Sequence, residues 1–189
     1  MKKVIIIHGN GGCTSQHHWT PWLKAELEKN KVKVLAPTMP DNVEAKKSIW
    51  LPYMHDKLQC DENTIIIGHS SGAVAAMRYA EQHKLLGSVL VSACYTDLGY
   101  ASERLAGYYN TPWQWDKIKN NQQWIVQFAS TDDPYIPIAE PQHIQSKLST
   151  DYYEFTDQGH FMNKTIPELV SIILKKLENS PKLPRTLIC

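Results

Sequence analysis

A five-residue segment at positions 68–72, Gly-His-Ser-Ser-Gly, carries the clearest chemistry in the sequence. It follows an apolar, β-branched run at 64–67 and precedes an alanine-rich, helix-prone run at 73–80. A G-x-S-x-G pattern between a strand and a helix is typical of a nucleophile elbow, a sharp turn that lifts a serine hydroxyl above a sheet. Glycines flank such a nucleophile because a side chain there would clash across the turn. The spacing predicts Ser70 rather than Ser71 as the nucleophile; the alternative is a plain strand-to-helix turn.

Two later residues have the types that would activate this serine. A serine hydroxyl is a weak nucleophile at neutral pH, so it needs a base, usually a histidine oriented by a carboxylate. In a parallel sheet, loops leaving the carboxyl ends of the strands converge at one edge. Asp133 follows an apolar run at 124–128, and His160 follows another run at 152–155. We therefore predict a triad in the chain order Ser70, Asp133, His160.

Other readings of these acids and histidines remain open at this point. Asp132 is an alternative to Asp133, and Asp157 is a weaker one because it shares a loop with His160. The two neighbouring aspartates could also form only a turn, since Asp-Pro favours turn initiation. His69 is expected to pack or hydrogen-bond locally rather than to act as the base. The adjacent residues His17 and His18 are expected to be exposed.

A glycine-rich loop after the first apolar run is a candidate for stabilising developing negative charge. The run at 3–7 ends in His-Gly-Asn-Gly-Gly at 8–12, where small residues let the backbone approach a site closely. A backbone N–H from this loop and that of Ser71 would form an oxyanion hole. Asn10 is the first choice and Gly11 the second. The alternative, a phosphate-binding loop, lacks both the G-x-G-x-x-G and the Walker lysine patterns.

Short apolar runs alternate with longer amphipathic ones, which indicates βαβ units and a mostly parallel sheet. We expect one α/β domain over 1–189, with helices on both faces of about six strands and a loosely attached tail at 179–189. The expected strands are 3–7, 32–35, 64–67, 88–92, 124–128 and 152–155.

Local signals refine the expected helices. A helical pattern at 43–58 contains Pro52, which predicts a break or kink. Thr165 and Glu168 precede the last helix with the spacing of a capping box. A further helix is expected between Pro137 and Leu148. The aromatic-rich segment at 94–120 either lines a pocket or only packs, and the sequence does not separate these possibilities.

Composition excludes several functional classes. The 189 residues carry a formal net charge of +1, which argues against nucleic-acid or anionic-membrane partners. No run approaches 18 apolar residues, so no membrane span is expected. The spacing of the cysteines indicates free thiols rather than a zinc site or a disulfide framework. We therefore expect a reducing compartment, the cytoplasm, with the nucleus as a second location. These cysteines are Cys13, Cys60, Cys94 and Cys189.

The His-Gly-Asn loop, the Ser70 elbow, Asp133-Pro134 and Gly159-His160 together resemble the α/β-hydrolase superfamily. More narrowly, the chain resembles the retinoblastoma-binding protein 9 family of small serine hydrolases. The resemblance implies an α/β-hydrolase fold with a minimal cap and a triad whose aspartate directly precedes proline, hence Asp133. It also implies an esterase or an amidase of aminopeptidase-like type, with a small ester or amide substrate and no cofactor or metal. The resemblance extends over 48–52, 65–73, 76–80, 111–115 and 130–134.

That family resemblance also suggests a function of a different class. Leu58-Gln59-Cys60-Asp61-Glu62 matches L-x-C-x-E, a pattern that binds retinoblastoma-type pocket proteins in extended form. The alternative function is therefore a binding module with a vestigial triad. However, the segment lies between a helix end and the strand that leads to Ser70, so its exposure would require partial unfolding. We expect it to be structural.

Overall fold

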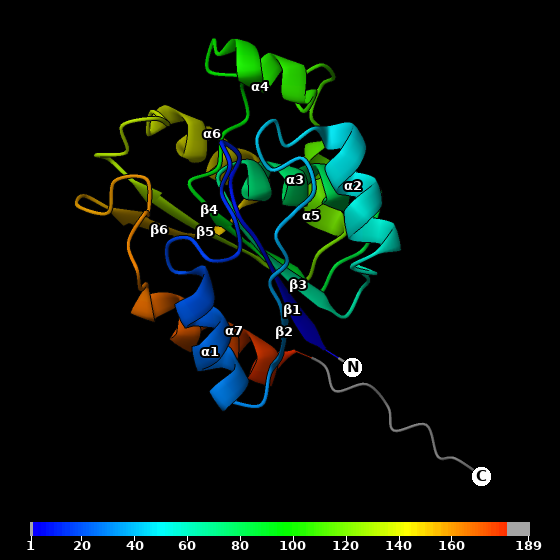
Figure 1. Ribbon diagram of the computed structural model, residues 1–189, viewed down its shortest axis with the longest axis vertical. Helices are drawn as coiled ribbons and strands as arrows, with labels where there is room; N and C mark the ends of the chain where they lie inside the picture. Colours follow the sequence, from blue (N-terminus) through cyan, green and yellow to red (C-terminus); the bar gives the residue numbers. More distant parts are fainter. Residues whose placement is uncertain (1, 181–189) are drawn as a thin grey trace.

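One sheet of six parallel strands forms the centre of the computed structural model, which describes residues 2–180 (Figure 1). The strand order is β2-β1-β3-β4-β5-β6, and every neighbouring pair is parallel. All six predicted strands are confirmed, with ends that differ by at most two residues. Their bounds are β1 Lys3–Ile7, β2 Lys33–Leu35, β3 Thr64–His69, β4 Gly87–Val91, β5 Ile125–Ser130 and β6 Asp151–Phe155.

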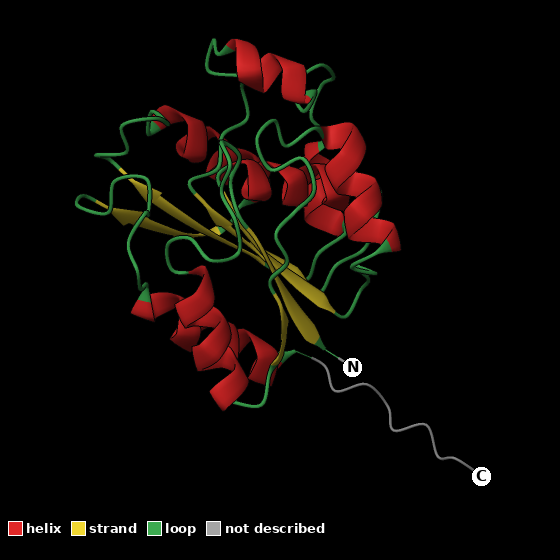
Figure 2. Ribbon diagram, in the orientation of Figure 1, coloured by secondary structure: helices red, strands yellow, loops and turns green. Residues whose placement is uncertain are grey.

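Helices cover both faces of the sheet, as expected for an α/β fold (Figure 2). Helices α1 and α7 lie on one face, α2, α3, α5 and α6 lie on the other, and the short helix α4 stands apart from both layers (Figure 1). The bounds are α1 Thr20–Lys29, α2 Lys47–Asp56, α3 Ser71–Ala80, α4 Ala101–Ala106, α5 Trp115–Asn120, α6 Ala139–Leu148 and α7 Pro167–Asn179. None of these helices is long and apolar enough to cross a membrane.

The two helical layers enclose two hydrophobic cores, one on each face of the sheet. Successive side chains of a strand point to opposite faces. In β1, Ile5 and Ile7 pack into the core with α2 and α3, whereas Val4 and Ile6 pack into the core with α1 and α7. Burial on both faces explains why the strands read as continuous apolar runs rather than alternating ones.

Two local predictions about helices need correction. Helix α2 continues through Pro52 without the predicted break, while a kink there stays a prediction. Because Pro52 is exposed, water can hydrogen-bond the carbonyl that its ring leaves unpaired. Helix α7 begins at Pro167, and its N-cap residue, Ile166, makes no side-chain cap bond, so Thr165 does not form the predicted capping box. Ile166 is buried in the core, and this anchor together with the proline fixes the start of α7.

The predicted tail falls largely outside the described residues. Within them, α7 ends at Asn179, and the hydroxyl of Ser180 donates to the carbonyl of Lys176 at 2.6 Å. Lys2 Nζ donates to the carbonyl of Ser180 at 2.9 Å. The first two residues of the predicted tail are therefore attached to the domain, and 181–189 lie outside the described part of the chain.

Candidate active site

Ser70 occupies the sharp turn between β3 and α3, with φ 54° and ψ −119°. A non-glycine residue rarely adopts a positive φ, and such strain concentrates at functional sites. A Cβ atom on Gly68 would overlap the backbone of Gly72, and a Cβ atom on Gly72 would overlap the carbonyl of Ile7. The turn therefore requires both glycines, for the steric reason that the sequence suggested.

The His160 ring pairs with Asp133 at the carboxyl end of the sheet. His160 Nδ1 lies 2.8 Å from Asp133 Oδ2 and 3.1 Å from Oδ1. Oδ1 also accepts the backbone N–H groups of Tyr135 and Ile136, at 2.9 and 3.1 Å, and Oδ2 accepts the Ser92 hydroxyl at 3.0 Å. Burial alone would raise the pKa of Asp133, but the His160 ring and the two N–H groups hold it below its ordinary value. An ionised carboxylate at Nδ1 places the ring proton there and leaves Nε2 free to accept a proton.

The two alternative acids lie elsewhere. Asp132 Oδ1 accepts the backbone N–H of Gly159 at 2.9 Å and the hydroxyl of Ser130, and both bonds lower the pKa of Asp132. Asp157 is exposed and accepts a bond from Gln158. Among the three candidates, the structure brings only Asp133 to the His160 ring. Asp132 fixes the loop that carries this histidine, a role the sequence analysis did not predict.

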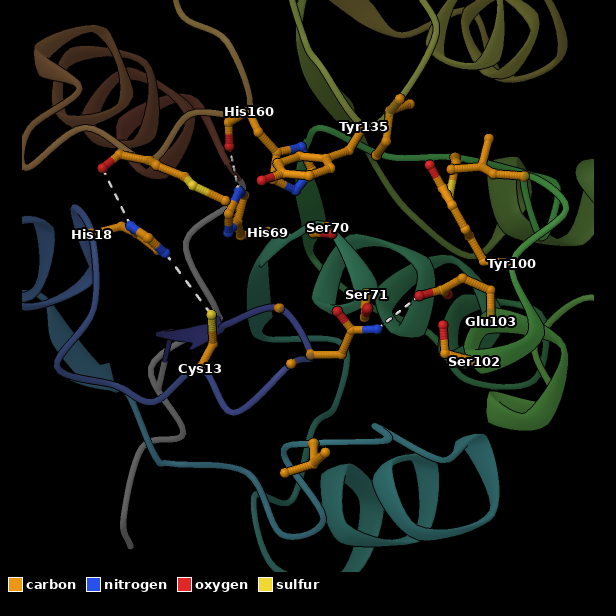
Figure 3. A pocket seen from close by; sticks show the side chains of 18 of the residues that line it. Cys13, His18, His69, Ser70, Ser71, Tyr100, Ser102, Glu103, Tyr135 and His160 are labelled. Carbon is orange, nitrogen blue, oxygen red and sulfur yellow. Dashed lines mark hydrogen bonds between the residues drawn. The ribbon is translucent and has the colours of Figure 1, made fainter.

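Three ring N–H groups hold the same loop from its other side. His69 Nε2 lies 2.8 Å from the His160 carbonyl, Trp19 Nε1 donates to the Phe161 carbonyl at 3.1 Å, and His18 Nδ1 lies 3.2 Å from the Met162 carbonyl. Two of these contacts are drawn as dashed lines in Figure 3. Burial, then the neighbouring His160, lowers the pKa of His69 to about 3, so His69 is neutral at neutral pH. His69 thus forms a hydrogen bond, but its partner lies 91 residues along the chain and is not the local one that the sequence led us to expect.

His18 corrects the expectation that both early histidines are solvent-exposed. His17 is exposed, but His18 is half-buried and lines the cavity beside Ser70. Its bond to a backbone carbonyl far along the chain depends on tertiary packing, which sequence spacing alone does not reveal. Burial lowers the pKa of His18.

The glycine-rich loop after β1 lies against the elbow. A Cβ atom on Gly9 would lie 3.7 Å from Ser70 Oγ, which shows how closely this backbone approaches the serine. The Gly11 N–H donates to the Val43 carbonyl at 3.0 Å, so it is engaged within the protein. The Asn10 N–H has no acceptor among the described residues. Ser71 opens α3, so its N–H has no intrahelical acceptor. Of the predicted donors, Asn10 and Ser71 have N–H groups without an acceptor in the described part of the chain, whereas the Gly11 N–H is paired.

A cavity of about 420 Å³ opens over Ser70 and His160, which both line its wall (Figure 3). Most of the remaining lining is apolar or aromatic. Four of its side chains are large, apolar and substantially exposed: Val43, Tyr100, Tyr135 and Met162. This is the concave, mostly apolar shape that binds small molecules.

Helix α4 belongs to a segment that covers one side of the cavity. At the start of this segment, Glu140 accepts the backbone N–H groups of Tyr95 and Thr96 at 2.8 and 3.0 Å. At its end, the buried guanidinium of Arg78 donates to the carbonyls of Tyr108 and Thr111, both at 2.7 Å. A half-buried carboxylate and a buried guanidinium on neighbouring elements thus fix the two ends of a small cap.

The aromatic residues of this segment divide between the two roles left open by the sequence. Tyr100 and Tyr109 line the cavity. Tyr95 and Trp115 pack around His143 of α6, with ring centroids 4.0 and 5.8 Å from it. Some aromatic residues of the segment at 94–120 therefore line the cavity, and others only pack against α6.

The L-x-C-x-E segment is partly buried. Leu58 and Cys60 lie in the core, whereas Asp61 and Glu62 are exposed. The Cys60 carbonyl accepts the Tyr79 hydroxyl at 2.8 Å, and burial raises the pKa of the Cys60 thiol to about 12. In this conformation, the leucine and cysteine of the pattern stabilise the fold and are not presented to a partner.

Known proteins resemble this chain in sequence along most of its length. Residues 4–166 match the family model described as Serine hydrolase. The chain is 49% identical over 177 residues to the protein named Serine hydrolase RBBP9 of Rattus norvegicus, covering 93% of this chain and 95% of the relative. It is 27% identical over 168 residues to Putative hydrolase YdeN of Bacillus subtilis, covering 85% of this chain and 86% of the relative.

Solved structures show the same fold. The crystal structure of the ydeN gene product from B. subtilis superposes with a TM-score of 0.85 at 26% identity, covering 95% of this chain and all of the other. Est1E from Butyrivibrio proteoclasticus, with ferulic acid bound, superposes with a TM-score of 0.75 at 12% identity, covering 95% of this chain and 89% of the other. The second likeness concerns the fold alone.

Proposed function

The chain belongs to the serine hydrolase family, and from this premise we propose that it cleaves a small carboxylic ester or amide through an acyl-enzyme on Ser70. One observation supports this most strongly. The Asp133–His160 pair and the strained Ser70 turn, which are distant in sequence, meet at the same cavity. A nucleophile, a base and an orienting carboxylate around a pocket are the parts that acyl transfer requires.

The proposed reaction proceeds in two halves. In the first, His160 Nε2 removes the proton from the Ser70 hydroxyl as its oxygen attacks the substrate carbonyl carbon. The imidazolium that forms is stabilised by the carboxylate of Asp133, and it then protonates the leaving alcohol or amine. In the second half, His160 takes a proton from water, which attacks the acyl carbon and releases the acid. The returned proton restores the Ser70 hydroxyl.

Two backbone N–H groups complete the proposed site. Those of Asn10 and Ser71 have no acceptor among residues 2–180; the first lies in the loop after β1 and the second opens α3, next to Ser70. Negative charge develops on the carbonyl oxygen during attack, and fixed donors stabilise it without reorganisation. Ser71 also lies at the N-terminus of α3, where the helix dipole favours negative charge.

Replacing the nucleophile tests this proposal. We expect Ser70→Ala to lower kcat for a small activated ester by about 10⁴- to 10⁶-fold, because the covalent step is removed. The thermal unfolding midpoint should change little, since the Ser70 hydroxyl has no hydrogen-bond partner among the described residues. Ser102→Ala is the matched control, because it removes another hydroxyl from the same cavity wall. Near-normal turnover by Ser70→Ala would refute the proposal.

A further inference from the structure

The described lining of the cavity over Ser70 carries a carboxylate but no lysine or arginine to balance it. Among the described residues that line it, Glu103 is the only one with a carboxylate, and none is a lysine or arginine. Apart from the histidines, the remaining lining is formally neutral, and much of it is apolar. A charge in a concave, low-dielectric wall acts more strongly on a bound ligand than the same charge on an open surface.

Hydrogen bonding fixes where this carboxylate lies. Glu103 belongs to α4 of the cap, and its Oε1 accepts the Asn10 side-chain N–H at 2.7 Å. Figure 3 shows this bond beside Ser71, at the first turn of α3. The bond joins the cap to the loop next to the nucleophile. Glu103 is therefore directed toward the reacting region and not toward bulk solvent.

The negative charge of Glu103 also affects the pKa values of two groups at the cavity. Burial raises the pKa of Cys94 to about 12, and the charge of Glu103 adds to that rise. Burial likewise raises the pKa of Tyr108 well above its ordinary value, with Glu103 the next contributor. Cys94 lines the cavity, and Tyr108 is buried near it. The charge of Glu103 thus acts on one group in the cavity wall, Cys94, and on Tyr108 behind it.

We propose that Glu103 is a specificity-determining residue that discriminates against substrates carrying a negative charge on the acyl group. This rests on the proposed hydrolysis at Ser70 and narrows its substrate class to acyl groups without an acid. Two features act in the same direction. An anionic group would be repelled by Glu103 and would find no lysine or arginine on the described lining, whereas an uncharged group would contact Tyr100, Tyr135 and Met162.

A pair of esters of similar size tests the proposal. We compare kcat/KM for 4-nitrophenyl pentanoate and 4-nitrophenyl hemisuccinate, which share a leaving group and differ in the charge of the acyl end. The wild-type protein should favour the neutral ester by about tenfold or more, allowing for solvent screening of a half-buried charge. Glu103→Gln should reduce this preference about fivefold, through faster hydrolysis of the hemisuccinate. The variant keeps an oxygen that can accept the Asn10 bond, so the change should fall on the hemisuccinate more than on the pentanoate.

Asp97→Asn is the matched control. Asp97 lies in the same cap segment and pairs with Arg104 at 3.5 Å, but it does not line the cavity. This variant should leave the preference unchanged. An unchanged preference in Glu103→Gln would overturn the proposal, as would an equal loss on both esters or an equal shift in Asp97→Asn. Turnover by Ser70→Ala would instead refute the proposed hydrolysis, so the two failures are distinguishable.

Discussion

At the scale of single residues, the sequence predicts steric requirements better than it predicts hydrogen-bond partners. The glycines around Ser70 were predictable because only a residue without a Cβ fits between the crossing backbones. The choice between Asp132 and Asp133 was not predictable from the residues themselves. Both lie on one turn, and the fold decides which side chain points toward His160. Only the family resemblance, with its aspartate directly before proline, favoured Asp133.

The different contacts of these two aspartates lead to a kinetic prediction. Asp133→Asn should lower kcat by about 10³- to 10⁴-fold, because the amide neither stabilises the imidazolium nor enforces the required tautomer. Asp132→Asn should cost about tenfold at most, since its remaining oxygen can still accept the Gly159 N–H. Steady-state kinetics on one activated ester measure both losses. Equal losses would contradict the separate roles given to the two acids.

His69 leads to a prediction about acid stability. Its pKa is about 3 in the folded protein, whereas in the unfolded chain the pKa of this imidazole is about 6.5. Between these values only the unfolded state binds the proton, so the free energy of unfolding should fall as pH decreases from about 6.5 toward 3. The slope from this group is up to about 1.4 kcal/mol per pH unit. His69→Gln retains a side-chain N–H that can reach the His160 carbonyl but removes the titration. Urea unfolding from pH 7 to pH 4 should therefore show a shallower slope for the variant, and parallel slopes would exclude this origin.

At the scale of elements, the strands were more predictable than the helix ends. Continuous apolar runs mark buried parallel strands, and all six were recognised within two residues. The start of α7 was misplaced because burial of Ile166 outweighs the local capping preference of Thr165. Helix α4 was not predicted, because its six residues are too few to show a helical period, and Glu140 and Arg78 hold the chain on either side of it from other elements.

The loop that carries His160 offers a test at this scale. Trp19→Phe removes the N–H that reaches the Phe161 carbonyl and leaves a buried acceptor unpaired, which should cost about 1–2 kcal/mol of unfolding free energy. Displacement of His160 should also lower kcat more than it changes KM. Trp124→Phe is the matched control, because Trp124 Nε1 is buried without a hydrogen-bond partner among the described residues. Urea unfolding and steady-state kinetics of both variants measure the difference, and similar effects from the two would show that the Phe161 bond is not responsible.

At the scale of the whole molecule, parallel topology brings remote residues together. Ser70, Asp133 and His160 follow β3, β5 and β6, whose carboxyl ends lie at one edge of the sheet. This convergence could be predicted once the strands were recognised, because it depends on strand direction alone. The shape and charge of the cavity could not be predicted from the sequence, because they depend on the cap and on the Asn10–Glu103 bond.

The central claim is that Ser70 becomes covalently acylated. Intact-mass analysis and peptide mapping after incubation with a fluorophosphonate probe test it most directly, because the probe forms a stable bond only with an activated nucleophile. We predict a single adduct that maps to Ser70 in the wild-type protein and is absent from Ser70→Ala. Folded wild-type protein that gains no adduct at saturating probe, or that is labelled on another residue, would contradict the account.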